Sequence, residues 1–242
     1  MSSPLPLFYK KIVPLNKTQH RKLYIEPLED YAFAAQTNSL YIAAVEFPRA
    51  SHEYPIVFAR DQSDGVFPVV LLGVEKNQNL FVDAKGAWSA DYIPAYARRY
   101  PFILAAPSAD ATQQFTVCID EAYAGFNTAK EGQALFDGKG KESDLLKKAI
   151  DFLKDYQTQV NVTNEFCKTM QTLALLEPME AHVNLKSGKK HSIGGFQCVS
   201  RDKLKAVPPD KLAEMMKRDQ LELIFAHLHS LSNLGKLTAK LP

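Results

Sequence analysis

Strand-like and helix-like patterns are segregated along this chain rather than alternating. Residues 31–116 hold short apolar or alternating runs, which are typical of strands. Residues 143–178 place apolar side chains about every 3.6 residues, which is typical of a helix. Because a doubly wound sheet needs strict alternation, this order favours an α+β fold. We predict a mainly antiparallel, β-rich N-terminal half and a helical C-terminal half that contains a β-hairpin.

The strand candidates of the N-terminal half are short and separated by turn signals. They are residues 31–35, 40–45, 55–59, 67–74, 80–83, 102–106 and 115–119. The run 67–74 is apolar throughout, as expected of a strand buried on both faces. The turn signal 77–79 then predicts that residues 80–83 return as its partner. Pro94 and Pro101 bracket one short helix between the later strands.

A glycine-rich segment divides the two textures. Residues 124–142 contain four glycines, and the flexible run GKGKES begins at Gly138. The predicted parts are therefore a β-rich half 1–123, a connection 124–142 and a helical half 143–242, although one integrated domain 1–242 stays open. Ser143 is a suitable N-cap, Pro178 is expected to end the long helix, and the residues 160–163 favour a kink.

The rest of the helical half is predicted as a hairpin and two closing helices. The hairpin spans 179–199 and turns at Ser187 and Gly188. The closing helices span 210–217 and 219–231, and Gly235 is a natural stop after them. The second helix has an apolar stripe of Leu221, Ile224, Phe225 and Leu228.

The charge balance and the N-terminus restrict the class of protein. The chain has 29 basic and 27 acidic residues and a net charge of +2, so no long-range attraction to nucleic acid is expected. The N-terminus lacks the order of a secretory signal, and no apolar run reaches the roughly 20 residues of a membrane helix. We expect a soluble cytoplasmic protein, with export by a signal-independent pathway left open.

Metal, cofactor and nucleophile motifs do not occur. Cys118, Cys167 and Cys198 form no Cys-x-x-Cys, so buried reduced thiols are expected. If Val183 pairs with Ile193 in the hairpin, His182 and His191 point to opposite faces and share no metal. His227 and His229 are two apart on a helix and face different ways. No P-loop or Gly-x-Ser-x-Gly is present. We predict no metal and no cofactor, and no catalytic residue can be named.

Adjacent arginines among aromatic residues are the sharpest binding candidate. Two guanidiniums can hold a carboxylate or phosphate, with aromatic faces lining the pocket. The competing interpretation is that the two arginines are cations at a helix C-terminus, where the helix dipole stabilises positive charge. The only tryptophan follows a glycine in a loop, as either a core wedge or a binding platform. The candidate ligand- or partner-binding residues are Arg49, Trp88, Tyr92, Tyr96, Arg98 and Arg99.

Four stretches together resemble one known family. They are EFPRASHEYPIVF, LLGVEKNQNLFVD, GAWSADYIPAYARRYPF and LELIFAHLHSLSNLGKL. They are similar to the bacterial SapC-like proteins, named for association with a paracrystalline surface layer. The resemblance runs from about Tyr9 to Leu237 and implies no catalytic residues. The matching positions are Glu46, Phe47, Tyr54, Pro55, Phe58, Asn79, Leu80, Phe81, Gly86, Trp88, Tyr92, Pro94, Arg98, Arg99, Tyr100, Pro101 and Phe102.

Two functional hypotheses follow, from different classes. The first is an accessory or interaction protein in surface-layer or envelope processes that binds a protein or peptide partner, because aromatic and arginine side chains are enriched at interfaces. The second is an enzyme or enzyme subunit with an Arg/Tyr/Trp-lined pocket for a small anionic or peptidic substrate. A purely structural surface-layer subunit is disfavoured by the balanced charge and the missing export signal.

Overall fold

The computed structural model describes residues 5–105, 115–184 and 190–241 and confirms the α+β fold. The chain groups into two compact units, each built from two separate stretches. Unit 1 comprises Met1–Tyr31 and Ala97–Thr158, and unit 2 comprises Ala32–Tyr96 and Gln159–Pro242. The glycine-rich segment 124–142 lies within unit 1. The division into a half 1–123 and a half 143–242 on either side of this segment stays a prediction.

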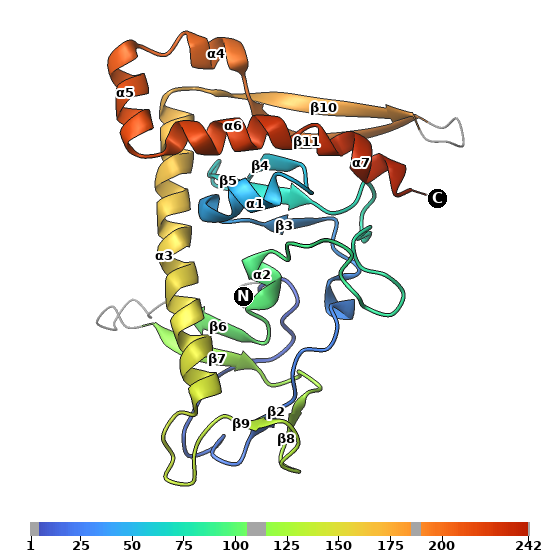
Figure 1. Ribbon diagram of the computed structural model, residues 1–242, viewed down its shortest axis with the longest axis vertical. Helices are drawn as coiled ribbons and strands as arrows, with labels where there is room; N and C mark the ends of the chain where they lie inside the picture. Colours follow the sequence, from blue (N-terminus) through green and yellow to red (C-terminus); the bar gives the residue numbers. More distant parts are fainter. Residues whose placement is uncertain (1–4, 106–114, 185–189, 242) are drawn as a thin grey trace. The chain divides into compact units, whose positions relative to one another are not determined.

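A five-stranded antiparallel sheet forms the centre of unit 2, in the order β10-β11-β4-β5-β3 (Figure 1). Its strands are β3 (Ser39–Tyr41), β4 (Ile56–Arg60), β5 (Val66–Leu71), β10 (Leu176–Asn184) and β11 (Lys190–Val199). Strand β5 pairs with β4 on one side and with β3 on the other. Its side chains are nearly all buried, as the apolar run 67–74 predicted.

Short helices accompany this sheet. They are η1 (Ala32–Ala34), η2 (Ala44–Glu46), α1 (Phe47–Ala50), α4 (Arg201–Lys205), α5 (Pro209–Lys217), α6 (Gln220–Ser230) and α7 (Asn233–Ala239). Helix α2 (Ala95–Arg98) contributes residues to both units. Helix α6 packs against β4, β11 and α1.

The fully buried His227 of α6 joins two strands of the sheet. Its Nδ1–H donates to the Ile56 carbonyl over 2.8 Å, and its Nε2 accepts the Val199 N–H over 3.0 Å. Ser230, one turn later, accepts the Ile56 N–H on Oγ. His227 and Ser230 therefore bond to backbone groups of β4 and β11. His229 is exposed and faces a different way, as the two-residue spacing predicted.

Two small antiparallel sheets build unit 1, in the orders β1-β7-β6 and β8-β2-β9. Their strands are β1 (Ile12–Pro14), β2 (Tyr24–Ile25), β6 (Phe102–Ala105), β7 (Thr116–Asp120), β8 (Phe126–Asn127) and β9 (Gln133–Ala134). One buried apolar cluster joins them to the following helix; it consists of Ile25, Phe102, Ile119, Leu135, Phe136, Leu146 and Leu153. The buried Asp120 accepts the backbone N–H groups of Lys10 and Lys11, which holds the N-terminal strand in place.

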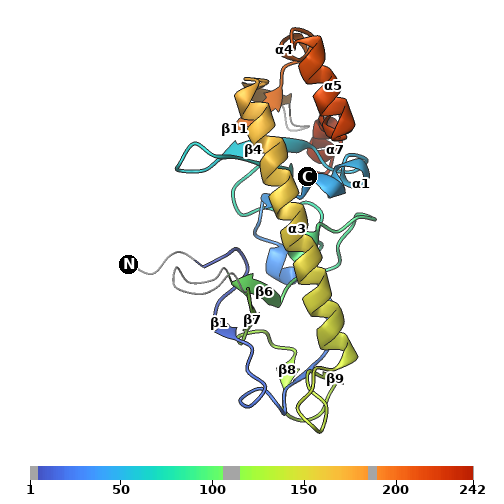
Figure 2. The same ribbon diagram turned by 90° about the vertical axis from the view of Figure 1, so that its left-hand side faces the viewer.

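The long helix is α3 (Asp144–Thr172), and it is continuous over 29 residues (Figure 2). Ser143 caps it by accepting the Leu146 N–H on Oγ, as predicted. The expected kink at 160–163 is wrong, because Thr163 is fully buried and its hydroxyl both donates to the Gln159 carbonyl and accepts the Ala44 N–H. Tertiary contacts of this kind override weak helix propensity.

Three predicted strands need correction. Residues 31–35 form η1 instead, and residues 40–45 divide between β3 and η2. Residues 80–83 form no strand and contribute only the isolated bridge Val82–Trp88. The physical reason is that both edges of β5 are already occupied by β3 and β4.

The hairpin is present, but its register differs from the prediction. Val183 pairs with His191, and Ile193 pairs with Ala181 rather than Val183. A two-residue slip leaves an alternating pattern of apolar residues unchanged, so that pattern cannot detect it. A β-bulge between Met179 and Ala181 then changes the offset for Leu176–Met179. The expected turn at Ser187 and Gly188 lies outside the described residues.

The C-terminal region contains more helix than predicted. Helix α3 ends at Thr172, and Pro178 lies in the edge strand β10, where a missing N–H is tolerated. Gly235 lies inside α7 and does not end a helix, and α4 was not predicted. On α6, the predicted apolar stripe is incomplete because Phe225 is 44% exposed.

No helix in the described part of the chain is long and apolar enough to cross a bilayer. The three cysteines are free and buried, as expected. Burial raises the pKa of the Cys167 and Cys198 thiols to about 12, so both stay protonated near neutral pH.

Candidate functional site

The six candidate residues divide between the two units. Arg49, Trp88, Tyr92 and Tyr96 belong to unit 2, whereas Arg98 and Arg99 belong to unit 1.

Trp88 and Tyr92 of unit 2 bond to Tyr54, which is fully buried. Trp88 donates its indole N–H to the Tyr54 hydroxyl over 2.8 Å, and that hydroxyl donates to the Tyr92 carbonyl. The Arg49 guanidinium lies over the Tyr92 ring, 5.5 Å from its centroid. Burial raises the pKa of Tyr54 far above its usual range, so the phenol stays protonated.

Two glutamates complete this cluster. Buried Glu46 accepts the Tyr92 hydroxyl over 2.6 Å and the Ala95 N–H over 2.7 Å on one carboxylate oxygen, and the Ala43 N–H over 2.8 Å on the other. Glu53 accepts the backbone N–H groups of Asp91 and Tyr92. The polar groups of Trp88, Tyr54 and Tyr92 thus bond within the protein, and we assign them to holding the 88–95 loop.

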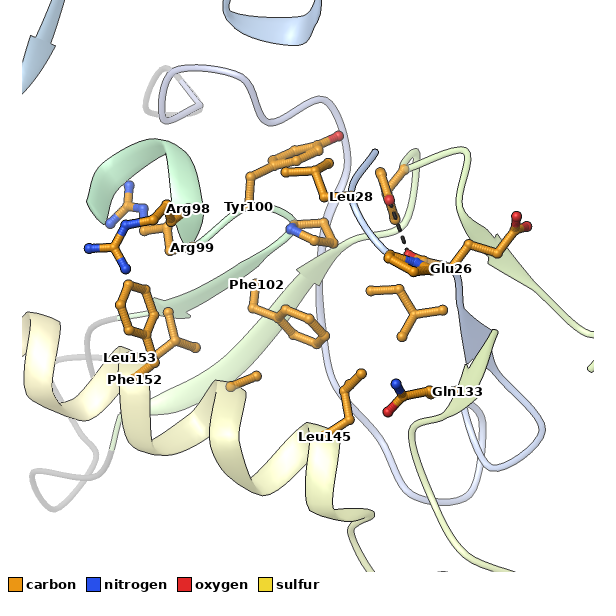
Figure 3. Close-up of a pocket in the computed structure, with 15 residues that line it drawn as sticks. Glu26, Leu28, Arg98, Arg99, Tyr100, Phe102, Gln133, Leu145, Phe152 and Leu153 are labelled. Atoms are coloured by element: carbon orange, nitrogen blue, oxygen red, sulfur yellow. Dashed lines mark hydrogen bonds between the residues drawn. The ribbon is translucent and has the colours of Figure 1, made fainter. Parts of the chain in front are cut away.

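The unit 1 arginines line a cavity of about 300 Å³, which we call the arginine cavity (Figure 3). Its lining residues are Ile25, Glu26, Pro27, Leu28, Arg98, Arg99, Tyr100, Pro101, Phe102, Tyr123, Gln133, Leu145, Ala149, Phe152 and Leu153. Figure 3 places Arg98 and Arg99 side by side at one end, and Glu26 and Gln133 at the opposite end. The residues between the two ends are mostly apolar, so the cavity has an apolar middle and polar ends.

Aromatic rings position both guanidiniums. The Arg98 Cζ lies 5.1 Å from the Phe152 centroid, and the Arg99 Cζ lies 5.1 Å from the Tyr156 centroid and 5.8 Å from that of Tyr9. Each cation–π contact contributes about 0.5–1 kcal/mol at an exposed site and more when desolvated. Burial raises the pKa of nearby Tyr31, and the positive charge of Arg98 partly offsets that rise.

Two tyrosines add hydroxyl groups to the lining. Tyr100 donates to the Asp120 carboxylate over 3.2 Å, and Tyr123 donates to the Glu26 carbonyl over 3.2 Å. Burial is the largest cause that raises the pKa of both phenols, and the Asp120 charge adds to it at Tyr100. Both side chains therefore stay neutral and offer rings and protonated hydroxyls rather than phenolate bases.

The SapC family model matches residues 15–237, which is most of the chain. The chain belongs to the SapC family. Searches of the curated proteins and of the solved structures gave no match. The family assignment confirms the resemblance seen in the sequence.

Sequence reasoning missed most of this SapC protein's cavity lining. Tyr123, Gln133, Phe152 and Leu153 lie far along the chain from the paired arginines and reach them only through the fold of unit 1. The available signal was the period of 3.6 in the long helix, whose apolar face carries Leu146 and Leu153. Tyr96 lies half-buried in α2 and is not among the cavity's described lining residues.

The acidic, histidine and cysteine side chains of the described residues form no cluster of three or more that could hold a metal ion. Within that range, the imidazole of His227 is occupied by two backbone groups, and burial lowers its pKa to about 4. Its environment is that of a neutral core histidine.

Proposed function

We propose that this SapC protein is an interaction protein that binds a protein or peptide partner through the arginine cavity. Its association with surface-layer or envelope processes, and its cytoplasmic location or signal-independent export, belong to the same proposal. Of the six binding residues proposed from the sequence, the proposal keeps Arg98 and Arg99. Trp88 and Tyr92 are left out because their polar groups already bond inside unit 2.

One observation carries the proposal: two guanidiniums lie at the end of a cavity of about 300 Å³ that is otherwise largely apolar. Ligand sites combine an apolar lining with a few polar groups that set orientation. Arginine and aromatic side chains are also over-represented among the residues that dominate binding energy at interfaces. The cavity combines both kinds of group.

Affinity capture with variants tests this proposal. We expect the wild-type chain to retain a stoichiometric partner from native lysate, and Arg98→Gln/Arg99→Gln to lose it. Arg201→Gln is the matched control, because Arg201 is an exposed arginine of α4 in unit 2. Equal retention by all three proteins, or no stoichiometric partner, would contradict the proposal. Circular dichroism melting checks that each variant is folded.

The second hypothesis is an enzyme that acts on a small anionic or peptidic substrate in the same cavity. The presence of Arg98 and Arg99 in the lining favours it, because this hypothesis requires a concave site with an arginine. Against it, the described lining contains no cysteine, serine or histidine, and its two tyrosines stay protonated. Mass spectrometry of candidate peptides incubated with the protein decides between the two, because binding alone leaves them unchanged.

A further inference from the structure

We infer that the arginine cavity recognises the C-terminal residue of a hydrophobic peptide, with the terminal carboxylate at Arg98 and Arg99 and the last side chain in the apolar middle. This inference rests on the proposed function and names the ligand class for the same site.

The arginine end has the chemistry of a carboxylate site. A guanidinium is planar, carries five N–H donors and matches the two oxygens of a carboxylate in a bidentate pair. Phe152 lies against Arg98, and Tyr9 and Tyr156 lie against Arg99, so aromatic contacts hold both side chains in place. Arginines held in this way lose less freedom when they bind an anion.

The middle of the cavity suits an apolar side chain. Ile25, Phe102 and Leu153 are at most 7% exposed and belong to the apolar cluster of unit 1. The volume of about 300 Å³ lies at the lower end of the range for ligand sites, roughly 300–1,000 Å³. It therefore fits one or two residues of an extended chain and excludes a folded element.

The opposite end argues for a peptide with one anionic end. The exposed side-chain amide of Gln133 can both donate to and accept from a peptide main chain. The Glu26 carboxylate points away from the cavity (Figure 3) and accepts from the Asn127 side-chain amide over 3.5 Å, so the described lining at this end presents the neutral amide of Gln133 and no cation for a second negative charge. A chain that carries its charge at the C-terminus and is neutral upstream matches both ends.

Calorimetric titration of the full chain with matched peptides tests the inference. The probe is acetyl-Ala-Ala-Leu-Phe with a free C-terminal carboxylate, compared with the same peptide amidated. We expect the acid to bind at least about 30-fold more tightly than the amide, as for loss of one partner of a charge-assisted pair. Phenylpropionate tests whether a small carboxylate suffices, and we expect it to bind more weakly than the peptide acid.

The variants separate charge from shape. Arg98→Gln/Arg99→Gln should remove the preference for the acid, and Arg98→Lys/Arg99→Lys should keep part of it because the charge remains. Leu145→Trp narrows the cavity and leaves both arginines, so it should weaken both peptides equally. Arg201→Gln should behave as wild type.

Two results would overturn the inference and leave the proposed function standing. One is equal binding of acid and amide, which would show that the cavity ignores the carboxylate. The other is tighter binding of phenylpropionate than of the peptide acid, which would make the ligand a small amphiphilic carboxylate. If no probe binds, the inference also fails, and the affinity-capture result then decides the proposed function separately.

Discussion

At the scale of single residues, this protein depends on a few buried polar side chains that each bond to several backbone groups. Glu46, His227, Asp120 and Thr163 are all nearly or fully buried, and each bonds to backbone groups of distant chain segments. Such groups are costly to bury alone and stabilise a structure only when fully bonded. Their removal should therefore cost more than the loss of any surface ion pair.

Glu46→Gln is expected to lower the free energy of unfolding by about 1–3 kcal/mol. The glutamine keeps one acceptor but places an NH₂ group against either the Ala43 N–H or the Tyr92 and Ala95 donors. Urea unfolding followed by circular dichroism measures the change. Glu222→Gln, at an exposed position of α6, is the control and should stay within about 0.5 kcal/mol of wild type. Equal effects of both substitutions would contradict this assignment.

His227 should make stability fall as the solution is acidified. Its pKa is about 4 in the folded protein, below the ordinary 6.5, so between these values only the unfolded chain takes up the proton. The contribution is complete above about pH 6.5 and decreases by roughly 1.4 kcal/mol for each pH unit below it. Urea unfolding measures the free energy of unfolding of wild type and of His227→Asn. We expect the difference between the two proteins to be about 2 kcal/mol smaller near pH 5 than near pH 7. His229→Asn, at an exposed position of the same helix, is the control, and an equal pH slope in all three proteins would assign the pH dependence to groups other than His227.

At the scale of elements, α3 is a helix whose sequence alone does not favour its full length. Its 160–163 stretch contains β-branched residues and asparagine, yet the helix is unbroken. A buried hydroxyl stabilises this stretch, because Thr163 donates to the Gln159 carbonyl of the same helix and accepts the N–H of Ala44, the first residue of η2.

Thr163→Val keeps the shape of this side chain and leaves the Ala44 N–H without its acceptor. We expect a loss of about 1–3 kcal/mol in the free energy of unfolding. Thr158→Val is the matched control, because its hydroxyl is exposed and bonds only to Lys154 one turn earlier. Chemical denaturation compares the two, and a larger loss for the control would refute the role given to Thr163.

At the scale of the whole molecule, the chain forms two units that are interleaved in sequence. The two stretches of unit 1 precede and follow residues 32–96, which belong to unit 2. Helix α3 contributes its first part to unit 1 and its last part to unit 2. Such an arrangement couples the stability of the units through shared elements, because melting of one continuous helix affects both.

Thiol labelling can measure this coupling. Cys118 lies in unit 1, Cys167 and Cys198 lie in unit 2, and all three are at most 3% exposed. In the native protein they should react with a thiol reagent at least about a hundredfold more slowly than a free cysteine, because they are buried and have raised pKa values. In increasing urea we expect all three to become reactive together. Labelling of Cys118 at a clearly different urea concentration would show that the units unfold separately.

Local patterns in the sequence were sufficient for the fold class and for several elements. The N-cap at Ser143, the buried run that became β5, the short helix after Pro94 and the hairpin of β10 and β11 all follow from periodicity and capping. These features depend on interactions between neighbours in the chain or on a repeat of two or 3.6 residues, which a single sequence displays directly.

Tertiary structure decided the pairing, the register and the composition of the candidate site. Residues 80–83 failed to form a strand because β3 and β4 occupy both edges of β5. The hairpin register slipped by two residues from Ala181 to Asn184, which no alternation pattern records, and a β-bulge before Ala181 changes it again. The neighbours Tyr96 and Arg98 in one short helix fall in different units, while Arg98 meets Phe152, 54 positions away. The family, the fold class and the paired arginines were recognisable from local patterns in the chain. Which side chains surround those arginines depended on long-range packing, because packing joins residues by distance in space and not by distance along the chain.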